Sequence, residues 1–193
     1  MKDPEELRKK QREERDNRER LKRILKAMPD ALLYEYDGSE SGTEGLGHKG
    51  AELVRIRFRP NPEYDPPTRV EQLLTGMAGT ILLDPQRQRL ARIDGSLQKD
   101  VSFGWGLLGH LDKGGRVLLE QGDVGDGNWV LRHLVLRFTG KLLFFKSIVV
   151  KTTETSSDFH RVADDLTFAQ GVALLKSQEA AVAKNAGLNS KQE

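Results

Sequence analysis

The chain has 193 residues, of which 37% are hydrophobic and 31% charged, and its formal net charge is +2. This length predicts one domain, and the near-neutral charge gives no support for a nucleic-acid or anionic-membrane partner. The absence of cysteine excludes disulfides, thiolate catalysis and cysteine metal sites. No apolar run approaches the roughly 20 residues of a membrane-spanning helix. The N-terminus is charged from Lys2 onward, unlike a signal peptide.

Residues 1–28 are predicted to form a charged helix or linker. Acidic residues precede basic ones by four positions, as in Glu19 and Arg23, which supports a solvated helix. Because acidic residues are interleaved throughout, the pattern favours a solvated helix over a nucleic-acid contact. We expect Pro29 to end the helix and its last two turns to dock on the domain. The docking stripe consists of Leu21, Ile24, Leu25 and Met28.

The segment 29–162 is predicted to form an antiparallel β domain, and 163–193 a C-terminal helix and a disordered tail. Turn-forming residues recur at a spacing typical of an up-and-down sheet, so we expect the strands in sequential order. Segment 68–75 fits a strand or a helical turn. The predicted strands are 31–37, 51–59, 79–84, 90–97, 129–138 and 142–153, with a hairpin in 101–121. The predicted loops and turns are 38–50, 60–67, 113–115, 122–128 and 139–141.

The central stretch 101–121 contains the formal spacing of a dinucleotide fingerprint, from Gly104 to Gly109. That motif requires a helix directly after it, and the Lys113–Gly115 turn leaves no room for one. The glycines are therefore interpreted as shaping a curved sheet.

Several predicted strands are apolar on both faces, namely 81–83, 117–119 and 142–145. In an antiparallel sheet with one solvent-exposed face, apolar and polar residues should alternate along each strand. These strands do not alternate, so either both faces of the sheet are covered or one face lines a cavity. The strand 51–59 does alternate, with an arginine row on one side. We predict that this row faces solvent, because no phosphate-cradling loop accompanies it. The row consists of Arg55, Arg57 and Arg59.

No catalytic group, metal site or cofactor is predicted. The four histidines lack metal-ligand spacing and are expected to be solvated or hydrogen-bonded. Six acidic residues lie in or near predicted turns, where aspartate caps its own backbone, although a carboxylate pair for glycoside hydrolysis could be among them. Trp105 and Trp129 are interpreted as core aromatics. The histidines are His48, His110, His133 and His160, and the acids are Asp84, Asp94, Asp100, Asp112, Glu120 and Asp123.

The run 75–121 resembles the second half of outer-membrane lipoprotein-sorting proteins of the LolA/LolB type. The shared pattern is a strand with a small-residue start, an Asp-Pro turn and a strand ending near an Arg-Ile pair, here Gly79–Pro85 followed by Leu90–Ile93. From about Leu25 to Val162 the chain is also similar to uncharacterised bacterial envelope proteins of that fold. The runs FGWGLLG, LDKGG and LLEQ carry much of this resemblance.

The resemblance implies a half-open antiparallel β-barrel wrapped round helices, with an apolar cavity that holds acyl chains. It also implies a periplasmic or cell-envelope location, whereas the chain as written has no signal peptide and would stay in the cytoplasm. The opening strands of a full family member are absent, so we expect an N-terminally truncated member or a fragment. The candidate lining residues are Phe103, Trp105, Leu107, Leu118, Leu142 and Phe144.

The leading hypothesis is a non-enzymatic module that binds a lipid or a lipoprotein's acyl chains, with an envelope protein as a further partner. The alternative is a structural or protein-interaction domain whose groove is filled by its own helix, either 21–28 or 166–175. A hydrolase with carboxylates assembled by the fold ranks third. We expect no transmembrane segment and no nucleic-acid partner.

Overall fold

The computed structural model describes residues 4–104, 107–143, 146–163, 165–167 and 169–178, which fall into two units, 1–157 and 158–193. The first unit contains the sheet and its helices, and the second contains a helix over residues 169–178. The elements of the first unit are α1 Pro4–Ala31, β1 Leu32–Ser41, β2 Glu52–Pro60, α2 Arg69–Gln72, the 3₁₀ turn η1 Leu73–Gly76, β3 Met77–Asp84, β4 Arg89–Leu97, β5 Val101–Phe103, β6 Gly109–Leu111, β7 Arg116–Asp123, β8 Trp129–Leu142 and β9 Lys146–Thr155.

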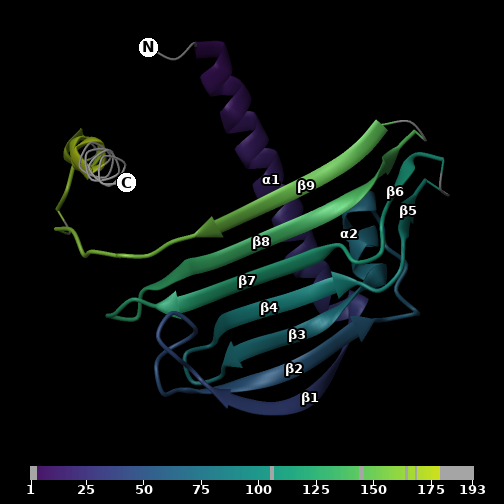
Figure 1. Cartoon of the computed structure of the whole chain (residues 1–193), viewed down its shortest axis with the longest axis horizontal. Helices are drawn as coiled ribbons and strands as arrows, with labels where there is room; N and C mark the ends of the chain where they lie inside the picture. Colours follow the sequence, from purple (N-terminus) through teal and green to yellow (C-terminus); the bar gives the residue numbers. More distant parts are fainter. Residues whose placement is uncertain (1–3, 105–106, 144–145, 164, 168, 179–193) are drawn as a thin grey trace, which may run out of the picture. The chain divides into compact units, whose positions relative to one another are not determined.

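The strands form one nine-stranded antiparallel sheet (Figure 1). The order is β1-β2-β3-β4-β7-β8, with β9 on the far side of β8 and β6-β5 beside its end. Within the described residues the sheet is not closed, since β1 and β9 do not pair. The predicted antiparallel sheet, with an N-terminal and a C-terminal helix in the sequence, is confirmed. The half-open LolA/LolB-type barrel stays a prediction.

The strand order is not sequential, in contrast to the prediction. Backbone bonds join Leu97 to Gly114 and Gly115, so the chain leaves β4 and returns to pair with it as β7. The excursion between them forms the β5–β6 hairpin, and β6 pairs with the second half of β8. The predicted hairpin over 101–121 is therefore divided: its first part lies at the end of β8, and its second part is β7, between β4 and β8.

Strand β8 runs straight through the predicted turn at Thr139–Lys141 and continues to Leu142. Gly140 opposes Leu111 of β6, and a Cβ atom on Gly140 would lie 2.1 Å from the carbonyl oxygen of His110. This glycine therefore permits close approach of two strands rather than a reversal of the chain. The reversal comes between Leu142 and β9.

Helix α1 continues through Pro29 to Ala31, so the prediction that Pro29 ends it is wrong. The last carbonyl groups of a helix need donors from outside it. Asn61 supplies two, its amide to Asp30 and its backbone N–H to Ala31, and the Tyr34 hydroxyl donates to Met28. These bonds support the extra turn before the chain enters β1.

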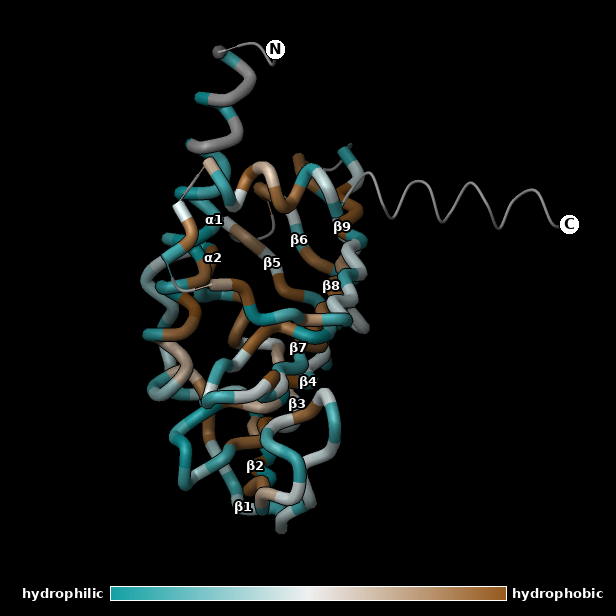
Figure 2. Tube along the Cα trace, turned by 90° about the vertical axis from the view of Figure 1, so that its left-hand side faces the viewer, coloured by the Kyte–Doolittle hydropathy of each residue, from teal (hydrophilic) through white to brown (hydrophobic). Residues whose placement is uncertain are grey.

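The main core lies between the sheet and the helices, on the face that we call the inner face. Phe58 of β2 is only 2% exposed and packs with residues of β1, β3, β4 and η1. Ile24, Ala27 and Met28 of α1 pack against this cluster. Figure 2 shows hydrophobic residues interspersed with hydrophilic ones along the strands. Burial of the hydrophobic side chains between sheet and helices stabilises the fold.

A smaller core lies on the opposite, outer face. It consists of Leu53, Leu82 and Ala91, covered by Leu46 and Ala51 from the loop after β1 and by Trp129. The predicted loop 38–50 is thus shorter than expected, because Gly38–Ser41 belong to β1. Two covered faces explain why strands such as β3 are apolar on both sides.

Segment 68–75 resolves into α2 and η1, the helical one of its two predicted forms. None of the helices among the described residues is both long and apolar enough to cross a membrane.

Candidate functional site

Exposed apolar side chains gather where the β5–β6 hairpin meets the end of β8. Phe103 opposes Gly109, and Gly109 opposes Leu142, so the two apolar residues share the inner face with a glycine between them. Phe103 is half-buried and packs on the main core, whereas Leu142 is 40% exposed. The row therefore runs from the core to the surface.

The loops beside this row add further exposed apolar residues. The backbone N–H of Leu143 donates to the Leu108 carbonyl at 3.3 Å, which holds the β5–β6 loop against the end of β8. Leu107 is 63% exposed and Leu143 58%. We call the group the end patch, and it consists of Phe103, Leu107, Leu142 and Leu143.

Three of the six predicted lining residues, Phe103, Leu107 and Leu142, belong to the end patch. Leu118 lies elsewhere: its neighbour Val117 packs on the inner core, so Leu118 faces outward, between Asp94 of β4 and Val135 of β8. The pattern 117–119 is apolar on both faces, so the sequence could not tell which residue faced inward. Trp105 and Phe144 lie outside the described residues.

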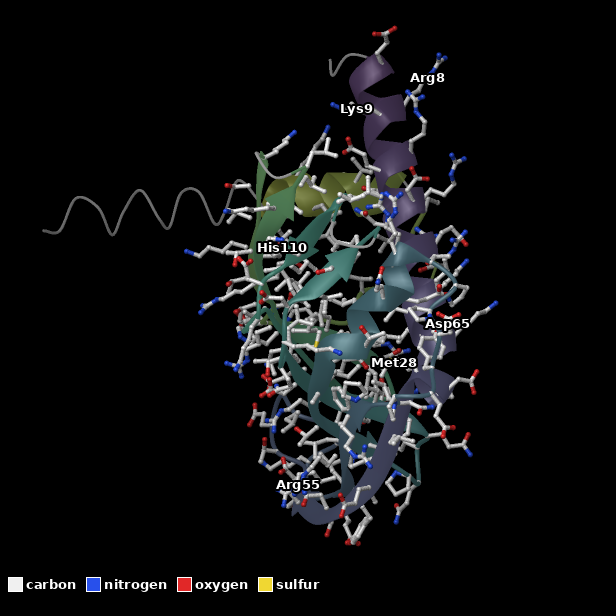
Figure 3. All side chains as sticks on the ribbon, turned by 90° about the vertical axis from the view of Figure 1, so that its right-hand side faces the viewer. Arg8, Lys9, Met28, Arg55, Asp65 and His110 are labelled. Carbon is white, nitrogen blue, oxygen red and sulfur yellow. The ribbon has the colours of Figure 1, made fainter. Side chains whose placement is uncertain are left out.

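The inner face over β1 to β4 is already occupied. Ile24 and Met28 of α1, with Leu73 and Leu74 of the η1 turn, pack against the core there. In Figure 3, Met28 lies on the helix side of the sheet, while Arg8 and Lys9 project from the N-terminal half of α1. Of the predicted docking stripe, Leu21 and Leu25 remain exposed, so the helix docks through one half of it.

A polar site lies at the other end of the strands, where two glycine-rich loops meet. Gly47 and Gly122 form a parallel bridge, and the Asp123 N–H donates to the Gly47 carbonyl at 3.0 Å. His48 Nδ1 lies 2.8 Å from Asp123 Oδ2, and the Gly125 N–H donates to Asp123 Oδ1 at 2.8 Å. A cavity of about 330 Å³ opens beside this pair, and Lys49, Arg87, Asp126 and Gly127 also line it.

The environment of Asp123 favours its charged form. The hydrogen bond from His48 and then that from the Gly125 N–H lower the pKa of Asp123, with a further contribution from Arg87. Because an ionised carboxylate only accepts hydrogen bonds, Nδ1 of His48 is the donor in this bond. A His–Asp pair of this kind can act as a general base, but the same bonds also join the two loops mechanically.

A second cavity has a volume of about 420 Å³. It is lined by Pro60, Asn61, Pro62, Tyr64, Thr75, Gly76, Gln98 and Lys99. Burial, and then the carboxylates of Glu71, Asp30 and Asp65, raise the pKa of Tyr64. Its phenol is therefore neutral over the physiological range. Glu71 is buried, and its Oε2 atom has no hydrogen-bond partner.

The six acidic residues singled out in the sequence all have partners. Asp84 and Asp123 accept nearby backbone N–H groups in turns, as predicted, whereas Asp100 accepts the N–H of Lys113, thirteen residues along the chain. Asp94 and Glu120 instead lie in strands and pair with arginines across the outer face. The other contacts are Asp84 to Arg87, Asp112 to Thr139 and His110, and Asp123 to His48.

The predicted arginine row lies on the outer face. Figure 3 places Arg55 on the side of the sheet away from α1. Arg55 and Arg57 form ion pairs with Asp37 of β1, and Arg55 also pairs with Glu40. The carboxylates of Asp37 and Glu40 therefore offset the positive charges of Arg55 and Arg57.

Three histidines have hydrogen-bonding or ionic partners, His48 with Asp123, His110 with Asp112 and His133 with Thr155. In the part of the chain that the structure describes, no three histidine or acidic side chains come together as a metal site would require.

Comparison with known proteins gave no match: no protein-family model, curated protein or solved structure is significantly similar to the chain. The resemblance to lipoprotein-sorting proteins accordingly remains a prediction from the residues quoted for it.

Proposed function

We propose that the chain is a non-enzymatic binding module that takes an acyl chain of an envelope lipid or lipoprotein on the end patch. The observation that carries the proposal is that Leu107, Leu142 and Leu143, all 40% to 63% exposed, lie where the β5–β6 hairpin meets the end of β8. Exposed apolar groups that are adjacent in space are typical of binding surfaces. The family resemblance gives independent support for this ligand class and for an envelope location.

Apolar burial alone can supply the binding free energy, so this function requires no catalytic group. Burial of an acyl chain contributes about 0.8 kcal/mol per CH₂. The row from Leu142 to Phe103 leads from the surface to the core and provides apolar contacts along its length. An acyl chain laid along this row would also cover Leu107 and Leu143, whose exposure otherwise carries a free-energy cost in water.

A second candidate function is a structural or protein-interaction domain. The packing of Ile24 and Met28 over the inner face of β1 to β4 favours it, because these side chains occupy the space that a barrel-lining ligand would need. This candidate predicts that the end patch binds a protein or nothing, and never a free lipid.

Native mass spectrometry of the purified protein, followed by organic extraction, separates the two. We expect an added mass that extracts as lipid, and saturable binding of a fluorescent fatty acid in solution. An apo mass together with no binding of the fluorescent fatty acid would reject the lipid function and favour the interaction domain.

Two matched variants locate the site. Leu107→Glu places a charge in the end patch and is expected to weaken fatty-acid binding about tenfold. Tyr36→Glu changes a residue on β1 that is even more exposed, and it should leave binding unchanged. Circular dichroism and thermal unfolding check that both variants are folded. Equal binding by both variants would place the ligand elsewhere.

A further inference from the structure

Strand β9 forms an edge of the sheet. It pairs with β8 along its whole length, and no other strand among the described residues pairs with it. It is ten residues long and contains neither glycine nor proline. Val149 is 70% exposed and Val150 39%. A long edge strand with exposed β-branched residues presents unpaired backbone groups to a further strand.

We propose that β9 pairs antiparallel with β9 of a second copy of this chain, with Val150 opposite Val150 across a two-fold axis. The two sheets then form one continuous sheet. The proposal is independent of acyl-chain binding and rests on the sequence and register of β9 alone.

Symmetry restricts the possible registers. A two-fold axis perpendicular to an antiparallel sheet passes between two directly opposed residues, so one residue of β9 must oppose itself. Only two choices keep nine residues of the ten-residue strand paired, namely axes at Val150 and at Lys151. Any other axis leaves more of the strand unpaired.

Charge distinguishes these two registers. With the axis at Val150, Lys146 of each copy opposes Glu154 of the other, and Ile148 opposes Thr152. With the axis at Lys151, two lysines oppose each other and Glu154 opposes Ile148. Opposite charges across a strand pair stabilise it and like charges destabilise it. The Val150 register is therefore favoured.

The side chains of β9 agree with this choice. Val150 opposes Phe138 and Ile148 opposes Gly140 in β8, so these two apolar residues lie on the inner face. Across the two-fold axis, Val150 meets Val150 on that same face. Lys146 and Glu154 oppose Leu142 and Leu134 within the chain, so neither has a charged residue directly opposite it in β8, and the dimer supplies one for each.

A charge exchange tests the register. Size-exclusion chromatography with light scattering should give a dimer for the wild-type chain at about 100 µM. In the Glu154→Lys variant a lysine faces a lysine at each end of the strand pair, which should weaken self-association about tenfold. The double variant Lys146→Glu with Glu154→Lys restores opposite charges and should restore the dimer. Lys151→Glu is the matched control, since Lys151 opposes Val149, and should leave the mass unchanged.

Disulfide crosslinking gives a second measurement, made simple because the chain has no cysteine. Val150→Cys should form a covalent dimer under mild oxidation, because opposed residues lie within the Cα separation of a disulfide, about 4.4–6.8 Å. Ser147→Cys, which opposes Thr153 in this register, should not. A wild-type monomer at the highest concentration, a double variant without restored mass, or equal crosslinking at both positions would overturn the proposal.

Discussion

His48 Nδ1 and Asp123 Oδ2 lie 2.8 Å apart although 75 residues separate them in the chain. Together with the Gly47–Gly122 bridge, this contact joins the loop after β1 to the turn between β7 and β8. Asp123 is almost fully buried in the pair and His48 only partly. The contact therefore fixes two loops that local sequence would leave independent.

Asp123→Asn should lower the free energy of unfolding by about 1–2 kcal/mol at pH 6, because it removes a charged hydrogen-bond acceptor. The pKa of Asp123 is lowered in the folded state from its ordinary value of 3.8. The charged carboxylate therefore stabilises the fold above pH 3.8, and this stabilisation is lost as the pH falls through the lowered pKa of the folded state. Urea unfolding should show a smaller difference in the free energy of unfolding between this variant and the wild type at pH 3 than at pH 6. Asp65→Asn, at an exposed site, is the control, and a difference that grows toward pH 3 would contradict the assignment.

The half-docked stripe of α1 predicts unequal effects for two apolar residues one turn apart. Ile24→Ala should destabilise the protein by about 1–2 kcal/mol, because Ile24 packs on the main core, whereas Leu21→Ala should stay within about 0.5 kcal/mol. Chemical denaturation of both variants measures this directly. Similar losses for both would mean that the whole stripe is buried.

Phe58→Ala removes the largest fully buried side chain of the inner face and should cost about 3–5 kcal/mol. Tyr36→Ala on the neighbouring strand, where the ring is exposed, should change stability by less than about 0.5 kcal/mol. A thermal unfolding experiment in which Tyr36→Ala is the more destabilising variant would contradict the assignment of the main core to the inner face.

Gly140→Ala tests the role assigned to this glycine inside β8. Its Cβ atom would lie 2.1 Å from the His110 carbonyl oxygen, so β6 must shift away, and we expect a loss of about 1–3 kcal/mol. Hydrogen exchange should show the amide groups of β6 losing protection before those of β3. Ser147→Ala, at an exposed position of β9, is the control, and an equally stable Gly140→Ala variant would indicate a turn after all.

Periodicity in the sequence predicted much of the sheet, since alternation over 51–59 and the turn residues after Asp84 act locally. It failed at Pro29 and Thr139–Lys141. At these sites, distant groups decided the outcome, with Asn61 and Tyr34 extending the helix and His110 approaching the backbone of Gly140. The residues around each of these sites do not indicate which distant groups will contact them.

The candidate sites divide in the same way. The sequence by itself determined that glycines are interspersed with apolar residues between 103 and 109 and that Asp84 and Asp123 cap turns. Only the tertiary structure decided that Leu118 faces outward, that Phe103 and Leu142 share one face, and that His48 meets Asp123. A strand with large apolar residues on both faces satisfies two orientations equally, and pairing with neighbouring strands selects one of them.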